Sequence, residues 1–220
     1  AKNNKVKKFI YASSCSVYGD HGKKLINENT IERPLTVYAL SKFSSEKEIL
    51  KFNSKSFNVI SLRFATLFGL SKRMRFDLGV NTMTKNVLQG KNIIVNGDGK
   101  QYRSFVHVKD VAKSIIFFMN YKKKLRYNVF NIGAKKNNVK IIELAKLFEK
   151  IFPKLKINKN LKNFDFRSYE VNFDRLNQLM NNKNFITLKE GITEIYDHYK
   201  SKKINFNSKI YYNLRIVKSK

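Results

Sequence analysis

The sequence predicts an α/β fold in which parallel strands alternate with helices. Residues 6–14 and 57–65 are short runs rich in apolar and aromatic side chains, as strands buried in a sheet are. Between them, residues 37–52 carry apolar side chains such as Leu40 and Phe43 at helical spacing. A strand, a helix and a second strand in this order form a parallel crossover unit, so we expect the helix to pack on the sheet.

The rest of the chain continues this alternation. The predicted elements are a helix at 80–88, strands at 93–95 and 102–108, a helix at 111–120, a strand at 129–133, a helix at 139–152, short extended pieces within 155–176 and a helix at 188–199. The turn at 96–99, Asn-Gly-Asp-Gly, predicts a hairpin between its flanking strands. Thr36 and Asp110 are predicted to cap the helices that follow them. Residues 201–220, rich in Lys and Asn, fit no element.

Composition narrows the class of protein. Hydrophobic residues make up 42% of the chain, as in ordinary globular proteins, and no apolar run reaches the ~18 residues of a membrane span. The single cysteine, Cys15, excludes an internal disulfide and suits the cytosol. The three histidines are scattered without the spacing of metal ligands. We therefore expect a cytoplasmic protein with neither a membrane span nor a metal site.

The chain is strongly basic, with 45 Lys and Arg against 16 Asp and Glu, a net charge of +29. One interpretation is nucleic-acid binding. The other is a general bias toward Lys, Asn, Ile, Phe and Tyr, as in proteins encoded by A+T-rich genes. The lysines are spread along the chain without a stripe or an interleaved aromatic platform, which favours the second interpretation. A basic surface would still attract a substrate that carries a diphosphate.

Tyr38 and Lys42 form the strongest candidate site. Four residues apart on a helix, they lie on the same face and present a phenol and an ammonium to one point. A neighbouring positive charge favours the phenolate, the form of tyrosine that accepts a proton. Ser14, at the predicted end of the first strand, could add a hydroxyl, because ligands bind outside the carboxyl ends of parallel strands. Together these groups could move a proton on and off an alcohol or carbonyl oxygen, as hydride chemistry requires.

Four motifs in order over residues 6–199 resemble the extended short-chain dehydrogenase/reductases, most closely their NAD-dependent nucleotide-sugar epimerase/dehydratase branch. They are Ala12-Ser13-Ser14-Cys15-Ser16-Val17-Tyr18-Gly19, Tyr38-x-x-x-Lys42, Leu62-Arg63-Phe64-Ala65-Thr66-Leu67-Phe68-Gly69 and Arg103-Ser104-Phe105-Val106-His107-Val108-Lys109-Asp110-Val111-Ala112. The resemblance implies the C-terminal part of a Rossmann-type, doubly wound parallel sheet with a small α/β lobe for the substrate. The expected division is 1–67 with 104–133 for the nucleotide-binding lobe and 68–103 with 134–200 for the substrate lobe, with 201–220 an uncertain basic tail.

The resemblance also implies roles for individual residues. Ser14 matches the Ser/Thr that binds the reacting sugar oxygen, Tyr38 the acid/base, and Lys42 the lysine that binds the nicotinamide ribose. Ala65 matches a backbone contact to the nicotinamide end. The implied cofactor is NAD, with NADP not excluded, and the full-length family forms homodimers.

The implied substrate is a nucleotide-diphosphate sugar, with four residues expected to contact it. Arg103 matches an arginine that holds the pyrophosphate, a task that suits a planar guanidinium. Arg167 is a second candidate phosphate contact, and Asn81 is equally a helix cap or a substrate ligand. Thr66 stands where sugar epimerases often have Asn. Arg73 and Arg75 either touch phosphates or belong to a solvated basic loop, and His107 is more readily a buried strand residue than an active one.

The type of reaction depends on residues 14–16. Dehydratases of this branch carry Thr-Asp-Glu there, because elimination of water needs a further acid and base. Ser14, Cys15 and Ser16 provide no carboxylate, so epimerisation through a 4-keto sugar is favoured, with 4-reduction or dehydration as alternatives. Cys15 is expected to be a packed residue, since reductases with a cysteine near this motif carry it at the position of Ser16.

One family feature is missing from the sequence. The nine glycines form no Gly-x-Gly-x-x-Gly grouping of the kind that cradles a dinucleotide pyrophosphate. We therefore expect the chain to be the C-terminal portion of a longer enzyme, truncated or split. The alternative is an inactive fragment that needs a separate N-terminal half.

Overall fold

The computed structural model describes residues 1–22, 24–161 and 168–213, and its centre is a parallel three-stranded sheet. The strand order is β1 (Lys8–Ser14), β3 (Asn58–Phe64) and β7 (Val129–Ile132). Helix α1 (Val37–Leu50) joins β1 to β3, so the predicted crossover unit and the α/β class are confirmed. The register aligns Ser14 with Phe64 and Phe64 with Ile132, so the three strands end at one edge of the sheet.

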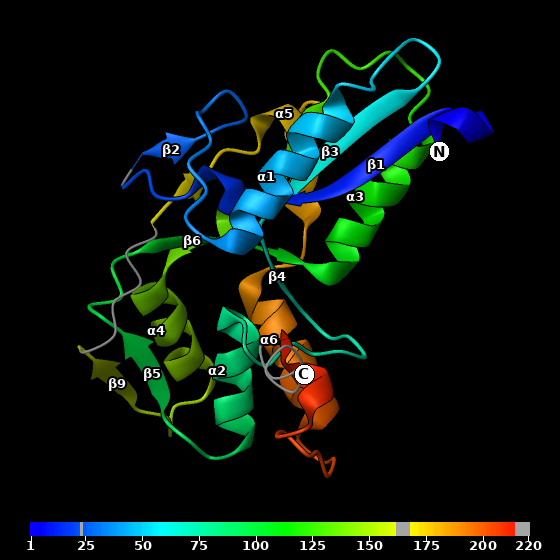
Figure 1. Ribbon diagram of the computed structural model, residues 1–220. Coiled ribbons are helices and arrows are strands. Elements are labelled where there is room, and N and C mark those ends of the chain that lie inside the picture. The colour runs from blue at the N-terminus through cyan, green and yellow to red at the C-terminus, as the bar shows by residue number, and fades with distance from the viewer. Residues whose placement is uncertain (23, 162–167, 214–220) are drawn as a thin grey trace.

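The two faces of this sheet differ in chemistry, because successive side chains point to opposite faces. Helix α1 covers the face that carries Ser61 and Arg63, which bond to Glu46 of the helix. Helix α3 (Val108–Asn120) covers the other face, where Ile60 and Leu62 belong to the same buried cluster as Phe118 and Phe130. Figure 1 shows α1 and α3 on either side of β1. The sheet therefore has an apolar face under α3 and a partly charged face under α1.

A second group of elements packs beyond the carboxyl edge of this sheet (Figure 1). It contains the mixed sheet β4 (Thr66–Phe68), β6 (Tyr102–His107) and β8 (Asn138–Lys140), the pair β5 (Ile93–Asn96) and β9 (Ile157–Asn160), and the helices α2 (Gly79–Leu88), α4 (Ile141–Ile151) and α6 (Leu188–Tyr199). Its apolar side chains form a separate buried cluster that includes Phe68, Val95, Phe148 and Ile192. The division into two lobes with the predicted boundaries stays a prediction.

The remaining elements are short. They are the strand pair β2 (Leu25–Ile26) and β10 (Glu170–Val171), helix α5 (Asp174–Asn177), and the 3₁₀ turns η1 (Lys2–Asn4), η2 (Cys15–Tyr18), η3 (Lys135–Asn137), η4 (Asn182–Asn184) and η5 (Lys209–Tyr211). Among the described residues, no helix is long and apolar enough to cross a membrane.

The predicted hairpin around residues 96–99 is wrong. Both flanking strands exist, but β5 pairs in parallel with β9, and β6 pairs with β4 and β8. Ile93 and Val95 alternate with exposed neighbours and are fully buried in the second cluster. A tight hairpin to β6 would remove these two side chains from that cluster, so tertiary packing overrides the turn signal.

Asp110 does not cap α3, because the helix begins earlier, at Val108. The N-cap is His107, whose Nδ1 accepts a hydrogen bond from the backbone of Lys109 at 3.3 Å. The fully buried carboxylate of Asp110 instead accepts the backbone N–H of Ile186 at 2.6 Å, just before α6. His107 is buried, as predicted, and its Nε2 lies 2.8 Å from Glu194 of α6. Both side chains tie α6 to the β6–α3 junction.

The described part of the C-terminal segment packs against the 70–77 loop. Tyr212 joins a buried cluster with Met74, Phe76 and Ile195. The Arg73 guanidinium donates to the carbonyl of Ile210 at 2.9 Å and to Asn213 at 2.6 Å, while Arg75 donates twice to Asp77 at 2.9 Å. Both arginines are therefore engaged within the chain, and the segment that the sequence left unassigned covers this loop.

Candidate active site

Ser14 and Ala65 lie next to each other where β1 and β3 end. Ser14 pairs with Phe64, and Ala65 is the next residue, with its N–H donated to the carbonyl of Ile132 at 3.0 Å. The Ser14 hydroxyl accepts a hydrogen bond from the N–H of Ser16 at 3.2 Å and so caps η2. This bond uses a lone pair and leaves the hydroxyl proton available for a further acceptor. The structure thus brings two predicted site residues to one edge of the sheet.

Tyr38 and Lys42 reach the same region from α1. The hydroxyl of Thr36 accepts the N–H of Ala39 at 3.1 Å, so the helix begins at Val37 and places Tyr38 in its first turn. The Lys42 ammonium donates to the carbonyl of Ala12 in β1 at 2.9 Å and lies 5.9 Å from the centre of the Tyr38 ring. Tyr38 is 57% exposed, which leaves its phenol accessible to a ligand. The predicted pairing of phenol and ammonium on one helix face is present.

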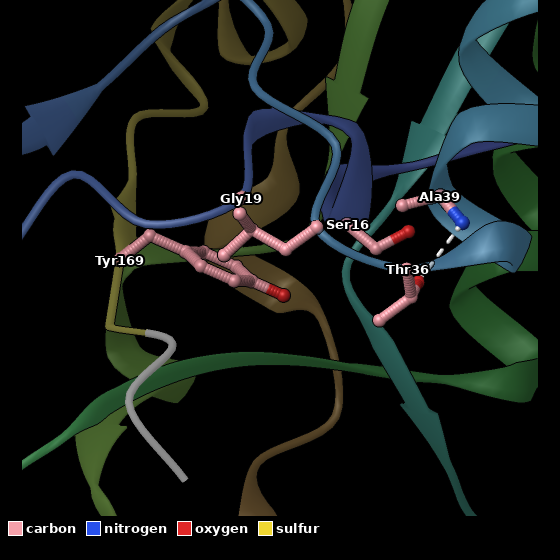
Figure 2. Close-up of a pocket in the computed structure, with 6 residues that line it drawn as sticks. Ser16, Gly19, Thr36, Ala39 and Tyr169 are labelled. Atoms are coloured by element: carbon pink, nitrogen blue, oxygen red, sulfur yellow. Dashed lines mark hydrogen bonds between the residues drawn. The ribbon is translucent and has the colours of Figure 1, made fainter.

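A small cleft opens beside the start of α1. Its lining comes from η2 and its flanks, from the turn before α1, from the helix itself and from the segment before β10: Ser16, Gly19, Leu35, Thr36, Ala39 and Tyr169. Figure 2 shows the Tyr169 side chain extending toward this region and the Thr36 hydroxyl bonded to the backbone N–H of Ala39. The Ser16 hydroxyl oxygen is buried and has no hydrogen-bond partner among the described residues. The cleft is therefore lined by the segments that directly follow Ser14 and directly flank Tyr38.

Arg103 is connected to this cleft through Tyr169. Its guanidinium carbon lies 5.6 Å from the centre of the Tyr169 ring, and its Nη1 donates to the carbonyl of Tyr102 at 2.7 Å. Arg103 is 9% exposed, so the ring and the β6 backbone hold its side chain in a defined direction. The second predicted phosphate contact, Arg167, lies outside the described residues.

Asn81 and Thr66 belong to the second group of elements. Asn81 does not cap α2, whose N-cap is Leu78; its side-chain amide instead donates to the carbonyl of Met74 at 2.6 Å. Its Oδ1 is buried without a partner among the described residues. Thr66 is half-buried at the start of β4, directly after Ala65. The capping alternative for Asn81 is thus wrong, and its role as a substrate ligand stays a prediction.

A buried ion pair behind the site was missed by the sequence reasoning. Arg63 of β3 and Glu46 of α1 are 2% and 1% exposed, and the Arg63 Nε lies 3.1 Å and 3.2 Å from the two carboxylate oxygens. Burial alone would raise the pKa of Glu46, but hydrogen bonds and the charge of Arg63 outweigh it and hold that pKa below its usual value. A charged residue inside an apolar strand needs such a partner, so Arg63 within residues 57–65 could have predicted a buried ion pair.

Cys15 is a packed residue, as predicted. It is 1% exposed, its Sγ lies 3.2 Å from the carbonyl oxygen of Arg63, and burial raises the pKa of the thiol well above its usual value. A cysteine in this state supplies neither an acid nor a thiolate to the cleft.

Tyr169 is a cleft residue that the sequence reasoning did not single out, although it falls two positions after Arg167.

The family follows from a comparison with known proteins. A family model described as the NAD dependent epimerase/dehydratase family matches residues 1–133, more than half of the chain. The chain belongs to the NAD dependent epimerase/dehydratase family. The resemblance predicted from the four motifs is thereby confirmed.

Several relatives of this epimerase/dehydratase chain are known. A UDP-glucuronate 4-epimerase of Thermodesulfobacterium geofontis is 26% identical over 191 residues, 85% of this chain and 57% of that protein. An uncharacterised UDP-glucose epimerase of Bacillus subtilis is 32% identical over 152 residues, 68% of this chain and 46% of that protein. This chain thus spans about half the length of these curated relatives.

Solved structures agree with the fold. The UDP-glucuronic acid 4-epimerase from Bacillus cereus, in complex with UDP-glucuronic acid and NAD, is 27% identical with a TM-score of 0.75. The match covers 87% of this chain and 60% of that one. A dTDP-glucose 4,6-dehydratase from Bacillus anthracis in complex with NAD, 23% identical with a TM-score of 0.77, shares the fold.

Proposed function

We propose that this chain carries the acid/base site of an NAD-dependent 4-epimerase that acts on a nucleotide-diphosphate sugar. The observation that carries the proposal is the exposed Tyr38 phenol on one helix face with the Lys42 ammonium, which is fixed to the β1 backbone beside Ser14. UDP-sugar epimerases among the relatives and structural neighbours support this reaction class. Reduction at C4 within the same family is the alternative that these residues leave open.

The chain's own residues would manage the proton in this reaction. The Tyr38 phenol oxygen would take the proton of the sugar 4-hydroxyl and later return it. The Ser14 hydroxyl would donate a hydrogen bond to the same oxygen. Bound NAD would supply the hydride acceptor and donor. Epimerisation then requires that the keto sugar present its opposite face before the hydride returns.

The residues present fit the nicotinamide end of the cofactor. Lys42 has an ammonium held at the edge of the sheet for the ribose hydroxyls, and Ala65 brings backbone to the same edge. No Gly-x-Gly-x-x-Gly grouping occurs in the 220 residues, so the residues named here would hold only the nicotinamide end of the cofactor. A homodimer and a cytoplasmic location complete the proposal.

Four residues are proposed to hold the substrate. Arg103, oriented by Tyr169, and Arg167 would bind the diphosphate through planar guanidinium groups. Asn81 would offer its Oδ1, which has no hydrogen-bond partner in the described part of the chain, and Thr66 its hydroxyl, to the nucleotide or sugar. The surplus of Lys and Arg would attract such an anion over longer range.

Residues 14–16 argue against dehydration. The buried Cys15 thiol and the Ser16 hydroxyl occupy positions where elimination would need a carboxylic acid and a carboxylate. Neither group can protonate a leaving hydroxide at neutral pH while also removing a carbon-bound proton.

The test is an NMR assay of sugar interconversion. The chain is assayed alone and joined at Ala1 to the part of the Thermodesulfobacterium geofontis relative that the match leaves uncovered, with NAD and either UDP-glucose or UDP-glucuronic acid. We expect the joined protein to form the C4 epimer of one of these sugars. Formation of a 4-keto-6-deoxy sugar would replace the proposal with dehydration, and the absence of any conversion by the joined protein would refute it.

A further inference from the structure

Arg63 is the centre of a buried network that joins several segments of the candidate site. Its Nε donates to Glu46 of α1, its Nη1 donates to the Tyr18 hydroxyl in η2 at 2.9 Å, and its Nη2 donates to Glu32 and Glu46. The Tyr18 hydroxyl in turn donates a hydrogen bond to the side-chain oxygen of Asn131 in β7 at 2.8 Å. A single guanidinium thereby connects one helix, one turn, one loop and two strands.

Each of these segments carries a residue of the site. Helix α1 carries Tyr38 and Lys42, and η2 follows Ser14 directly. Arg63 itself precedes Ala65 by two residues on β3. The loop with Glu32 leads into the cap at Thr36 that starts α1. The network is thus placed directly behind every part of the acid/base site.

Glu46 ties the helix to the sheet on the face that also carries Tyr38 and Lys42. Tyr38, Lys42 and Glu46 follow each other at intervals of four residues and therefore share that face. Glu46 is held by Arg63 and by the Ser61 hydroxyl, which donates to it at 2.6 Å. Eight residues of helix span about 12 Å, so a tilt of only about 5° at Glu46 would displace Tyr38 by about 1 Å.

We infer that Arg63 and Glu46 are positioning residues that set the placement of Tyr38 and Lys42 against Ser14 and Ala65. The guanidinium fork is suited to this task because its rigid plane satisfies several acceptors in fixed directions, which an ammonium cannot do. The pair is not in the cleft and acts only through the residues that it orients. For catalysis the inference rests on the proposed function, and the geometric part stands without it.

The first test needs neither cofactor nor substrate. The chain is labelled with ¹³C on its tyrosine rings, and the resonances of Tyr38 and Tyr11 are assigned from Tyr38→Phe and Tyr11→Phe. Both rings face Lys42, whose ammonium lies 5.9 Å and 5.2 Å from their centres. We expect both resonances to shift in Arg63→Lys, which keeps the charge and loses the fork. Unchanged resonances in the folded variant would overturn the inference.

A matched control separates positioning from general destabilisation. Phe148→Leu alters the buried cluster around α4, which is remote from the network. The free energy of unfolding of both variants is measured by urea denaturation, and their spectra are compared at urea concentrations where these free energies are equal. The Tyr38 and Tyr11 resonances of Phe148→Leu should stay in place; equal shifts in both variants would also overturn the inference. If Arg63→Lys does not fold, the pair Glu46→Met with Arg63→Met replaces it, because this double change removes both charges of the buried pair together.

The second test is kinetic and uses the joined protein of the NMR assay. We expect Arg63→Lys to lower kcat by roughly 10- to 100-fold, the cost of a misplacement near 1 Å, with little change in KM. If the wild-type joined protein is active and Arg63→Lys has the same kcat, the positioning role is refuted and the proposed function is not. An inactive wild type would refute the proposed function, while the tyrosine resonances would still decide the placement.

Discussion

Gly19, which lines the cleft, provides a quantitative test of the local geometry. Its backbone has φ of +71° and ψ of −127°, a combination that L side chains rarely adopt. A Cβ added there would lie 1.8 Å from the carbonyl oxygen of Arg33, a backbone atom that cannot rotate away. The loop around Arg33 leads to the Thr36 cap. We therefore expect Gly19→Ala to strain the turn and to displace the start of α1.

The expected cost combines two contributions. Backbone strain of this kind costs about 1–3 kcal/mol. Forcing an extra carbon into a packed position adds about 1–3 kcal/mol. We predict that Gly19→Ala lowers the free energy of unfolding by about 4 kcal/mol, together with a loss of epimerase turnover in the joined protein.

Gly90→Ala is the matched control. Gly90 also has a positive φ, +66°, but an added Cβ would meet no atom within 4 Å. Only the left-handed backbone then costs energy, about 1–2 kcal/mol. Urea denaturation followed by far-UV circular dichroism measures both variants. Equal losses for Gly19→Ala and Gly90→Ala would refute the close approach to Arg33.

Three further predictions concern the same region. Thr36→Ala removes the cap of α1, and Thr187→Ala removes the cap of α6; each should lower the free energy of unfolding in urea by about 1 kcal/mol. Only Thr36→Ala should reduce turnover, and equal effects of the two variants on turnover would contradict the placement of Tyr38. The pKa of Glu46 in the folded chain is held below its usual value, so the ionised carboxylate stabilises the fold. This stabilisation is fully present at a pH above the usual pKa and is lost as the pH falls through the lower pKa of the folded chain. Glu46→Gln should thus destabilise the chain by about 2 kcal/mol between about pH 6 and 8, with a smaller difference below about pH 4.5; a difference that grows in acid would contradict this sign. Cys15 should resist iodoacetamide in the folded chain and react in urea, as mass spectrometry would show; rapid alkylation of folded protein would mean that the thiol is accessible.

Local signals sufficed for the elements that dominate the fold. Thr36 and Thr187 both accept a backbone N–H at the start of their helices, and α6 covers residues 188–199, the range that its periodicity predicted. The strand–helix–strand unit could be predicted because its pattern is set by burial on a parallel sheet. The same reasoning placed Ser14 at the end of its strand, whereas Ala65 was expected there only from the family resemblance.

The errors arose where distant residues decide the outcome. The turn at 96–99 is a strong hairpin signal, yet β5 pairs with β9, more than sixty positions along the chain. Asp110 looked like a cap because the sequence does not show that α3 starts at Val108 and that Ile186 needs an acceptor. The packing of Tyr212 on the 70–77 loop has no local signal either.

The most direct test of the central claim is the turnover of Tyr38→Phe in the joined protein, compared with Tyr196→Phe. Both substitutions remove only a hydroxyl, but Tyr196 lies on α6 against Phe152, in the second group of elements. A general acid/base typically contributes ~10²–10⁴-fold to the rate, and its removal loses that factor. We predict a loss of that size in kcat for Tyr38→Phe and none for Tyr196→Phe. Wild-type kcat in Tyr38→Phe would contradict the assignment of the acid/base site.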